Sequence, residues 1–213
     1  MLTNLSEKGT YRMSEQNLTT KNPKPDRPLK YFNNPKPKEW LANDLSKNKY
    51  ADWKFPSVSD GLGVRGSLFV SGCKFHCLHC FNASIWNFNN GKDYTPEVED
   101  KIMKDLSHSY VRGLTLLGGE PFLNTGIIIP LIDRVRRELP DKDIWSWSGY
   151  TWEELLKESD DKLEMLSKLD VLVDGRFDNR LKQGDHPFRG SSNQRIIDVQ
   201  KSLKTGKIIK LMA

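Results

Sequence analysis

All three cysteines of this chain fall within eight residues, and their side chains are the best suited to chemistry. They are Cys73, Cys77 and Cys80, spaced C-x3-C-x2-C, and a short apolar run at 67–70 that predicts a strand comes just before them. Thiolates this close in sequence can point at one centre only if the chain wraps around that centre as a loop. A soft metal ion or an iron–sulfur cluster is the natural occupant of such a loop.

A disulfide or a structural zinc site fits the three cysteines less well. A disulfide with one spare thiol is disfavoured because the count is odd and the chain shows neither a cysteine framework nor a signal peptide. Zinc is the serious alternative, since His76 or His79 could complete a Cys3His set. Structural zinc sites usually take their ligands in two pairs from separate segments, and this sequence has no second pair. Three thiolates without a fourth favour a 4Fe–4S cluster with one iron left open.

The length and the composition bound the organisation of the chain. Its 213 residues predict one folded domain, residues 34–213, after a polar, proline-bearing leader at residues 1–33 that we expect to be flexible. No apolar run approaches the roughly 20 residues of a membrane-spanning helix, so we expect no membrane association. The N-terminus lacks the basic and then apolar pattern of a secretory signal. These features predict a cytoplasmic protein, in which free thiolates can bind a metal.

The positive charge is concentrated in the first part of the chain. The formal net charge is +5, and residues 1–50 carry ten Lys or Arg against five Asp or Glu. The remaining residues carry 23 of each sign and are therefore electrically balanced. A protein that binds a polyanion normally places a basic stripe on its folded body. We therefore expect no nucleic-acid partner.

Strand and helix patterns alternate along the rest of the chain. Thr95, Pro96 and Glu97 form a helix start, and that helix should run to about Leu106. Thr151 and Glu154 form a capping box at the start of another helix. The remaining predicted elements are strands at 113–117, 143–148 and 170–174 and helical segments at 38–45, 127–139 and 163–166, while 195–203 is ambiguous.

This alternation predicts an α/β fold with a parallel sheet. About four strands have clear signals, too few for a closed eight-stranded barrel, so we expect an open or partial β/α barrel. In such sheets reactive groups gather at the carboxyl ends of the strands. The loops expected on this one rim are the cysteine loop, Gly118–Pro121, Ser148–Tyr150 and Asp174–Arg176.

The run Gly118-Gly119-Glu120-Pro121 is the second candidate for chemistry. By itself it is a turn between a strand and a helix. Two glycines at a strand end also expose backbone donors and acceptors and let a ligand approach closely. The carboxylate that follows them could pair with an ammonium group.

Together, the cysteine spacing and the Gly-Gly-Glu-Pro run resemble the radical S-adenosylmethionine superfamily. The agreement extends to segments that are not general in that superfamily: 60–65, 68–73, 142–150, 173–177 and 189–194 are similar to a glycyl-radical-enzyme activating family, the anaerobic ribonucleoside-triphosphate reductase activating proteins. The resemblance covers roughly residues 34–204. His79 departs from the superfamily pattern, which often has an aromatic residue there, but the activating proteins vary at this position. Some relatives have Cys at the position of Gly66. Because this chain has Gly there, a cysteine at this position is not a required cluster ligand.

The resemblance implies a partial α/β barrel of the radical S-adenosylmethionine type, with one 4Fe–4S cluster on Cys73, Cys77 and Cys80. It implies that S-adenosylmethionine binds the open iron and is cleaved after a one-electron reduction, with flavodoxin or ferredoxin as the usual reductant. The resulting 5′-deoxyadenosyl radical would take a hydrogen atom from a glycine of the anaerobic ribonucleoside-triphosphate reductase, leaving a glycyl radical on that subunit.

Residue roles follow from the same resemblance. Gly118, Gly119 and Glu120 would bind the amino end of S-adenosylmethionine. Asp174 and Arg176 lie where related enzymes place polar cofactor contacts, and Ser146 and Ser148 match such positions too. No side chain is expected to be catalytic beyond the cluster and the cofactor.

Two further expectations concern the surface and the partner. We expect Trp145 and Trp147 to lie in the core, and Tyr150 and Trp152 to be surface contacts. A chain this small should need its partner to complete the enclosure of the site. The alternatives that remain are an activator of another glycyl-radical enzyme, such as pyruvate formate-lyase, and a non-catalytic zinc-binding module.

Overall fold

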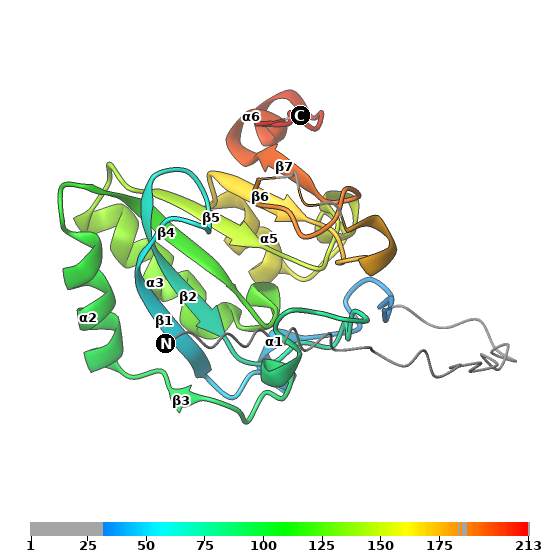
Figure 1. The fold of residues 1–213 in the computed structure, drawn as a ribbon, viewed down its shortest axis with the longest axis horizontal. Coiled ribbons are helices and arrows are strands. Elements are labelled where there is room, and N and C mark those ends of the chain that lie inside the picture. Colours follow the sequence, from blue (N-terminus) through cyan, green and yellow to red (C-terminus); the bar gives the residue numbers. More distant parts are fainter. Residues whose placement is uncertain (1–31, 183, 185–186, 213) are drawn as a thin grey trace, which may run out of the picture.

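The computed structural model describes residues 32–212, except 183, 185 and 186. The predicted leader at 1–33 therefore lies outside the described residues, apart from its last two positions. In the described part a single sheet has the strand order β3-β1-β2-β4-β5-β6-β7 (Figure 1). Its strands are β1 (Lys49–Ser57), β2 (Val64–Val70), β3 (Lys92–Asp93), β4 (Val111–Gly118), β5 (Asp143–Trp147), β6 (Val171–Asp174) and β7 (Arg195–Asp198).

The four central strands are parallel, and antiparallel strands flank them. Strand β2 pairs with β4, β4 with β5, and β5 with β6 in parallel, whereas β1, β3 and β7 run antiparallel to their neighbours. At the end of the first parallel pair Val70 lies opposite Gly118, so the loops that follow β2 and β4 start side by side. The expected α/β fold with an open, largely parallel sheet is confirmed.

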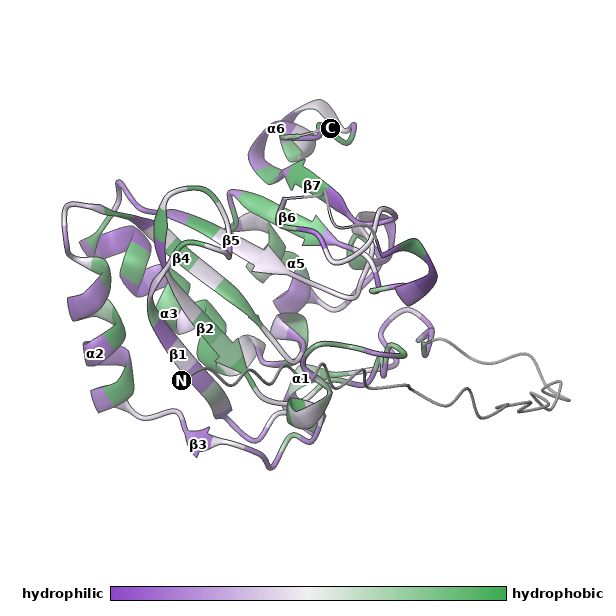
Figure 2. Ribbon diagram, viewed as in Figure 1, coloured by the Kyte–Doolittle hydropathy of each residue, from purple (hydrophilic) through white to green (hydrophobic). Residues whose placement is uncertain are grey.

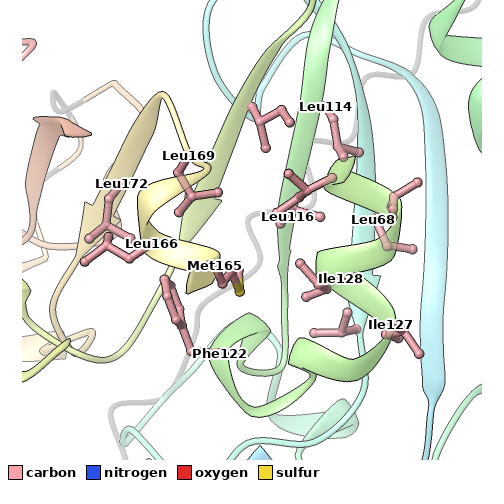
Figure 3. Packing of buried hydrophobic residues seen from close by; sticks show 14 of the residues in the cluster. Leu68, Leu114, Leu116, Phe122, Ile127, Ile128, Met165, Leu166, Leu169 and Leu172 are labelled. Carbon is pink, nitrogen blue, oxygen red and sulfur yellow. The ribbon is translucent and has the colours of Figure 1, made fainter. Parts of the chain in front are cut away.

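Helices cover one face of this sheet. They are α1 (Ala42–Leu45), α2 (Pro96–Leu106), α3 (Thr125–Glu138), α4 (Trp152–Leu155), α5 (Asp160–Ser167) and α6 (Val199–Thr205), with 3-10 turns η1 (Ala83–Ile85), η2 (Pro121–Leu123) and η3 (Asn179–Leu181). Figure 3 shows Leu68, Leu114 and Leu116 of the sheet facing Ile128 of α3. Alternate positions of a strand point to opposite faces, so Leu172 joins this core while Val171 belongs to a second, smaller cluster around Trp145.

The helix signals of the sequence correspond to real helix starts. Helix α2 begins at Pro96 after Thr95 and ends at Leu106, as predicted, and Figure 2 shows one side of it hydrophilic and the other hydrophobic. The capping box is complete, because the Thr151 side chain accepts from the amide of Glu154 while the Glu154 side chain accepts from the amide of Thr151. The ambiguous stretch contains both predicted alternatives: β7 ends at Asp198, whose side chain then caps α6.

Three features of the fold differ from the predictions. Strands β1 and β3 were not predicted; β1 is half exposed along most of its length and β3 has only two residues, both exposed, so neither carries a continuous apolar signal. The expected helix at 38–45 is confined to α1, and Leu41, just before it, is 40% exposed. Tyr150 and Trp152 are buried, because the segment after β5 turns under the cysteine loop and packs against it. Within the described ranges no helix is both long and apolar enough to cross a membrane.

Candidate functional site

One pocket collects the loops that follow the parallel strands. The four loops expected on one rim all contribute to it, together with the loop before β7. Its lining residues are Cys73, Phe75, Cys77, Cys80, Asn82, Leu117, Gly118, Gly119, Glu120, Trp147, Ser148, Gly149, Gly175, Phe177 and Gln194. The structure thus brings the two candidate motifs of the sequence, the three cysteines and Gly-Gly-Glu, into one site.

The cysteine loop leaves β2 through a sharp change in backbone direction. Gly72 has a φ of 93°, and His76 and His79 also have positive φ, at 51° and 60°. Non-glycine residues seldom adopt this conformation, and such backbone strain is concentrated at functional sites. These turns wrap the chain so that all three thiols border the pocket; Cys73 and Cys77 are buried and Cys80 is partly exposed.

Burial shapes the acidity of two of these thiols. Desolvation raises the pKa of Cys73 well above its usual range, and the nearby carboxylate of Glu120 raises it further. Desolvation likewise raises the pKa of Cys77 to about 11, an effect that Cys80 reinforces and Arg176 opposes. The metal-free pocket therefore disfavours thiolates, and the positive charge of bound iron would offset this cost.

The two glycines lie against the start of the cysteine loop. The amide of Gly119 donates to the carbonyl of Val70 and the amide of Glu120 donates to the carbonyl of Gly72, both at 2.8 Å. A Cβ atom at Gly119 would lie 2.3 Å from the carbonyl oxygen of Gly72. Gly118 has a φ of 108°, where its own Cβ would also meet the backbone of β2 at 2.7–2.8 Å. Only glycine permits this close approach of the two loops.

Glu120 is a buried carboxylate held by three donors. Its Oε1 accepts from the amide of Phe122 at 3.1 Å and from the hydroxyl of Ser148 at 2.9 Å. Its Oε2 accepts from the amide of Gly149 at 2.8 Å. Each carboxylate oxygen can accept about two hydrogen bonds, so Oε2 retains capacity for one more. Burial raises the pKa of Glu120 to about 7 despite these donors.

The other residues predicted to contact the cofactor have different positions. Ser148 lines the pocket, and its hydroxyl also accepts from the amide of Tyr150 at 3.0 Å. Ser146 is buried outside the pocket lining, and its hydroxyl donates to the carbonyl of Trp147 at 3.4 Å. Asp174 is also outside the lining; it accepts from the amide of Trp152 and pairs with Arg195.

Arg176 likewise lies outside the pocket lining, behind the cysteine loop. Its guanidinium forms a bidentate pair with Glu154 at 2.8 and 3.0 Å and donates to the carbonyl of Gly149. It also lies 4.6 Å from the ring centre of Phe75. The structure therefore gives Arg176 contacts to both the cysteine loop and the loop after β5.

Several lining residues were not predicted from the sequence. Asn82 donates from its side chain to the carbonyl of Gly118 at 3.2 Å and so joins the far end of the cysteine loop to the glycines. Gln194 donates to the carbonyl of Gly175 at 2.8 Å, which places it on the pocket wall. The signal for Gln194 was its position at the end of the segment 189–194. Asn82 carried no such signal, because its partner is 36 residues away.

The histidines of the loop do not complete a zinc site. His76 is exposed and stacks on Trp86, with ring centres 4.6 Å apart, and His79 is exposed too. Within residues 32–212, leaving aside 183, 185 and 186, no three His, Cys, Asp or Glu side chains are arranged to hold a single metal ion. A single zinc needs sulfur atoms about 2.3 Å from one point, whereas a cluster spreads its thiolates more widely.

The pocket fits an iron–sulfur cluster with one open iron. Its donor set is three thiols, and the chain has no further cysteine that could close the fourth position. Beside the thiols lie a glycine backbone without side chains and a carboxylate with acceptor capacity to spare. Such walls can receive a small ligand that carries an amino group.

Comparison with known proteins agrees with this arrangement. Residues 59–197 match the model of a family described as "4Fe-4S single cluster domain". This match includes the three cysteines, Gly118–Glu120 and Gln194, while residues 32–58 precede it.

Curated relatives are similar to nearly two thirds of this chain. The anaerobic ribonucleoside-triphosphate reductase-activating protein of Vibrio cholerae is 45% identical over 141 residues, which span 64% of this chain and 89% of that protein. The protein of the same name from Escherichia coli K12 is 40% identical over 141 residues, spanning 64% of this chain and 90% of the relative. That of Enterobacteria phage T4 is 40% identical over 139 residues, spanning 64% and 85%.

Proposed function

This chain belongs to the 4Fe-4S single cluster domain family and to the anaerobic ribonucleoside-triphosphate reductase-activating proteins, and from that premise we propose its reaction. It is a radical S-adenosylmethionine oxidoreductase that activates an anaerobic ribonucleoside-triphosphate reductase by generating a glycyl radical on it. The observation that carries the proposal is the single pocket bordered by three cysteines and by Gly118–Glu120.

Cys73, Cys77 and Cys80 would hold the 4Fe–4S cluster. When bound, the cluster supplies the electron for reductive cleavage of S-adenosylmethionine, the source of the radical used on the reductase glycine. The protein's own work is to bind the cofactors, to orient them and to keep water away. Burial of Cys73 and Cys77 serves the last of these tasks.

Gly118, Gly119 and Glu120 would bind the methionyl amino group of S-adenosylmethionine. The free acceptor position of Glu120 Oε2 suits an ammonium donor, and an ionised carboxylate roughly doubles the strength of such a hydrogen bond. Ser148 and the amide of Gly149 hold this carboxylate in place. Ser148 therefore acts on the cofactor through Glu120.

Asp174, Arg176 and Ser146 would act from behind the pocket. Asp174 fixes the start of α4 through the amide of Trp152, and Arg176 fixes the cysteine loop through Phe75. These contacts support positioning roles for Asp174 and Arg176. Ser146 is likewise buried outside the pocket lining.

The proposal also includes the type of barrel, the electron donor and the cellular compartment. The four parallel strands with helices on one face support a partial barrel of the radical S-adenosylmethionine type. We expect a flavodoxin or ferredoxin as the electron donor. Free cysteines that must stay reduced to bind iron favour the cytoplasm.

Anaerobic reconstitution with iron and sulfide tests the cofactor assignment. We expect a brown protein with broad absorption near 400 nm, about four irons per chain, and 5′-deoxyadenosine when S-adenosylmethionine and dithionite are added. A colourless protein that retains one zinc ion and cleaves no S-adenosylmethionine would contradict the proposal.

A further inference from the structure

Residues 32–46, here called the N-terminal strap, precede the family match and run along the outside of the cysteine loop (Figure 1). The strap's first contacts are with the loop's backbone. The amide of Asn33 donates to the carbonyl of Phe75 at 2.7 Å, and its side-chain nitrogen donates to the carbonyl of Lys74 at 2.6 Å. Both acceptors lie between Cys73 and Cys77. One strap residue therefore fixes two consecutive carbonyls of the loop segment that joins these cysteines.

Arg176 also binds this end of the strap. Its Nε donates to the carbonyl of Asn33 at 3.1 Å, and its guanidinium lies over the rings of both Phe32 and Phe75. The carbonyl of Gly149 and the carboxylate of Glu154 take its remaining donors. Arg176 thus joins the strap, the cysteine loop and the segment after β5 in one network.

The middle of the strap packs against Phe75 through Trp40. Trp40 is 6% exposed and packs edge to face on Phe75, with ring centres 5.1 Å apart, and on Tyr150 at 6.4 Å. Phe75 and Tyr150 pack on each other at 4.9 Å. Phe75 also lines the pocket, so the cluster of three rings connects the strap directly to the wall of the site.

A buried ion pair fastens this part of the strap. Lys162 and Glu158 are almost fully buried and lie 2.7 Å apart. Lys162 also donates to the carbonyl of Trp40 at 2.5 Å, and Glu158 accepts from the amide of Lys38 at 3.2 Å. A buried pair is tolerated only when further hydrogen bonds satisfy its remaining groups. The strap supplies two of these bonds.

The far end of the strap reaches the other half of the site. The hydroxyl of Ser46 donates to the side-chain oxygen of Asn124 at 2.9 Å. The side-chain nitrogen of Asn124 donates to the carbonyls of Ser71 and Glu120, both at 3.0 Å. Asn124 thereby links the segment before the first cysteine to the Gly-Gly-Glu run, and the strap holds its side chain in orientation.

We propose that the N-terminal strap positions the cysteine loop for cluster binding, with Asn33 and Trp40 as its positioning residues. The inference rests on the proposed function only in taking the three cysteines as ligands. A loop with two positive-φ histidines has a strained backbone, and the strap contributes hydrogen bonds and packing that select this conformation. The preformed arrangement then exists before the cluster binds.

Alkylation of the metal-free, reduced full-length chain tests this directly. Iodoacetamide is added under anaerobic conditions, and mass spectrometry follows each cysteine separately. In Asn33→Ala we expect Cys73 and Cys77 to react about fivefold faster than in wild type, the factor for one lost hydrogen bond. Cys80 is already partly exposed and should keep its rate, so it serves as the reference within the same molecule.

Matched variants separate positioning from general damage. Asn34→Ala alters an exposed neighbour and should leave all three rates unchanged. Trp40→Ala should accelerate Cys73 and Cys77 at least as much as Asn33→Ala, and Trp40→Phe should restore most of the protection. Leu41→Ala, at a residue 40% exposed, should resemble wild type.

A second readout uses the reconstituted cluster. In Asn33→Ala and Trp40→Ala we expect a shifted midpoint potential and a changed EPR signal of the reduced cluster, with Asn34→Ala unchanged. Wild-type alkylation rates in both strap variants would overturn the proposal. So would equal acceleration of all three cysteines with a lowered thermal midpoint. A wild-type chain that takes up no iron would contradict the proposed function instead, since the alkylation result is obtained without metal.

Discussion

At the scale of single residues, Glu120 is the side chain on which most of the site's contacts meet. It accepts hydrogen bonds from two loops, it lies near Cys73 in the pocket lining, and its Oε2 keeps capacity for one further hydrogen bond. Its carboxylate is nevertheless buried, which raises its pKa to about 7. Burial therefore disfavours the ionised form of Glu120 in the metal-free protein, and a bound ammonium group would stabilise that form.

This carboxylate gives the metal-free protein a distinct pH dependence. An unfolded Glu titrates near 4.5, and the folded group near 7, so the folded state binds the extra proton between these values. The stability contribution of Glu120 is therefore present below pH 4.5 and lost as the pH rises to about 7. Between pH 5 and 8 we expect the free energy of unfolding of wild type to fall relative to Glu120→Gln, by up to about 3 kcal/mol. Urea titrations across this range measure it, and parallel curves for the two proteins would refute it.

The cysteines give a sharper functional prediction. Cys77→Ala should bind little iron after reconstitution and should cleave no S-adenosylmethionine, because it leaves only two thiolates for the cluster. Leu78→Ala, beside it but exposed, should retain both properties. Iron content and 5′-deoxyadenosine formation are the measurements. Undiminished turnover in Cys77→Ala would mean that the ligand assignment is wrong.

At the scale of elements, the site depends on how closely the ends of β2 and β4 approach. Their registered ends bring Val70 beside Gly118, and the loops that follow remain hydrogen bonded through Gly72 and Glu120. Parallel pairing thus fixes the distance between the cysteine loop and the Gly-Gly-Glu run. This close approach is possible because Gly118 and Gly119 have no side chains.

Gly119→Ala tests this close approach. Its Cβ would lie 2.3 Å from the backbone oxygen of Gly72, so one of the two loops must move. We expect a loss of stability of about 1–3 kcal/mol in urea unfolding, together with reduced iron uptake. Gly126→Ala is the matched control, because its Cβ would have only an ordinary contact at 3.8 Å and lies in helix α3. That variant should be slightly stabilised, by up to about 1 kcal/mol. Equal stability of the two variants would contradict the packing argument.

Local signals in the sequence predicted the elements that local physics determines. Pro96 at a helix start and the Thr151–Glu154 capping box depend on residues within one turn, and both are found in the structure. The burial of Tyr150 depends instead on Trp40, which is 110 positions earlier and reaches it through tertiary packing. No pattern in either segment carries that information.

The candidate site, like the fold, was predictable in part from the sequence. The spacing of the cysteines and the Gly-Gly-Glu run lie at strand ends, and a parallel sheet brings strand ends together, so their meeting followed from the sequence. Which side chains face the pocket did not follow. Asp174 and Arg176 occupy the expected loop, yet Arg195 and Glu154 hold them as ion-pair partners outside the lining.

At the scale of the whole molecule, exposed aromatic and aliphatic side chains lie next to the pocket wall. Phe81, next to Cys80, is 68% exposed and contacts Phe177 of the pocket wall, with ring centres 5.3 Å apart. Leu181 is 40% exposed and precedes Lys182, whose ammonium lies over the Phe81 ring. The proposed reaction brings a reductase glycine to the pocket, so we expect these neighbouring exposed side chains to contact the reductase.

Phe81→Ser tests that contact. Buried aromatic residues often dominate binding at interfaces, so we expect the KM for the reductase to rise about tenfold. Iron content and S-adenosylmethionine cleavage without the reductase should stay near wild type. Tyr110→Ser is the control, since Tyr110 is 57% exposed but precedes β4, at the opposite end of the sheet. An equal effect of the two substitutions would place the reductase contact elsewhere.

The most direct test of the proposed function is an EPR measurement on the target enzyme. The reconstituted chain is mixed anaerobically with the anaerobic ribonucleoside-triphosphate reductase, S-adenosylmethionine and a reductant, and a parallel sample contains pyruvate formate-lyase instead. We predict a glycyl radical signal on the reductase, with 5′-deoxyadenosine formed alongside it, and none on pyruvate formate-lyase. A radical on pyruvate formate-lyase alone, or on neither protein while S-adenosylmethionine is cleaved, would contradict the account.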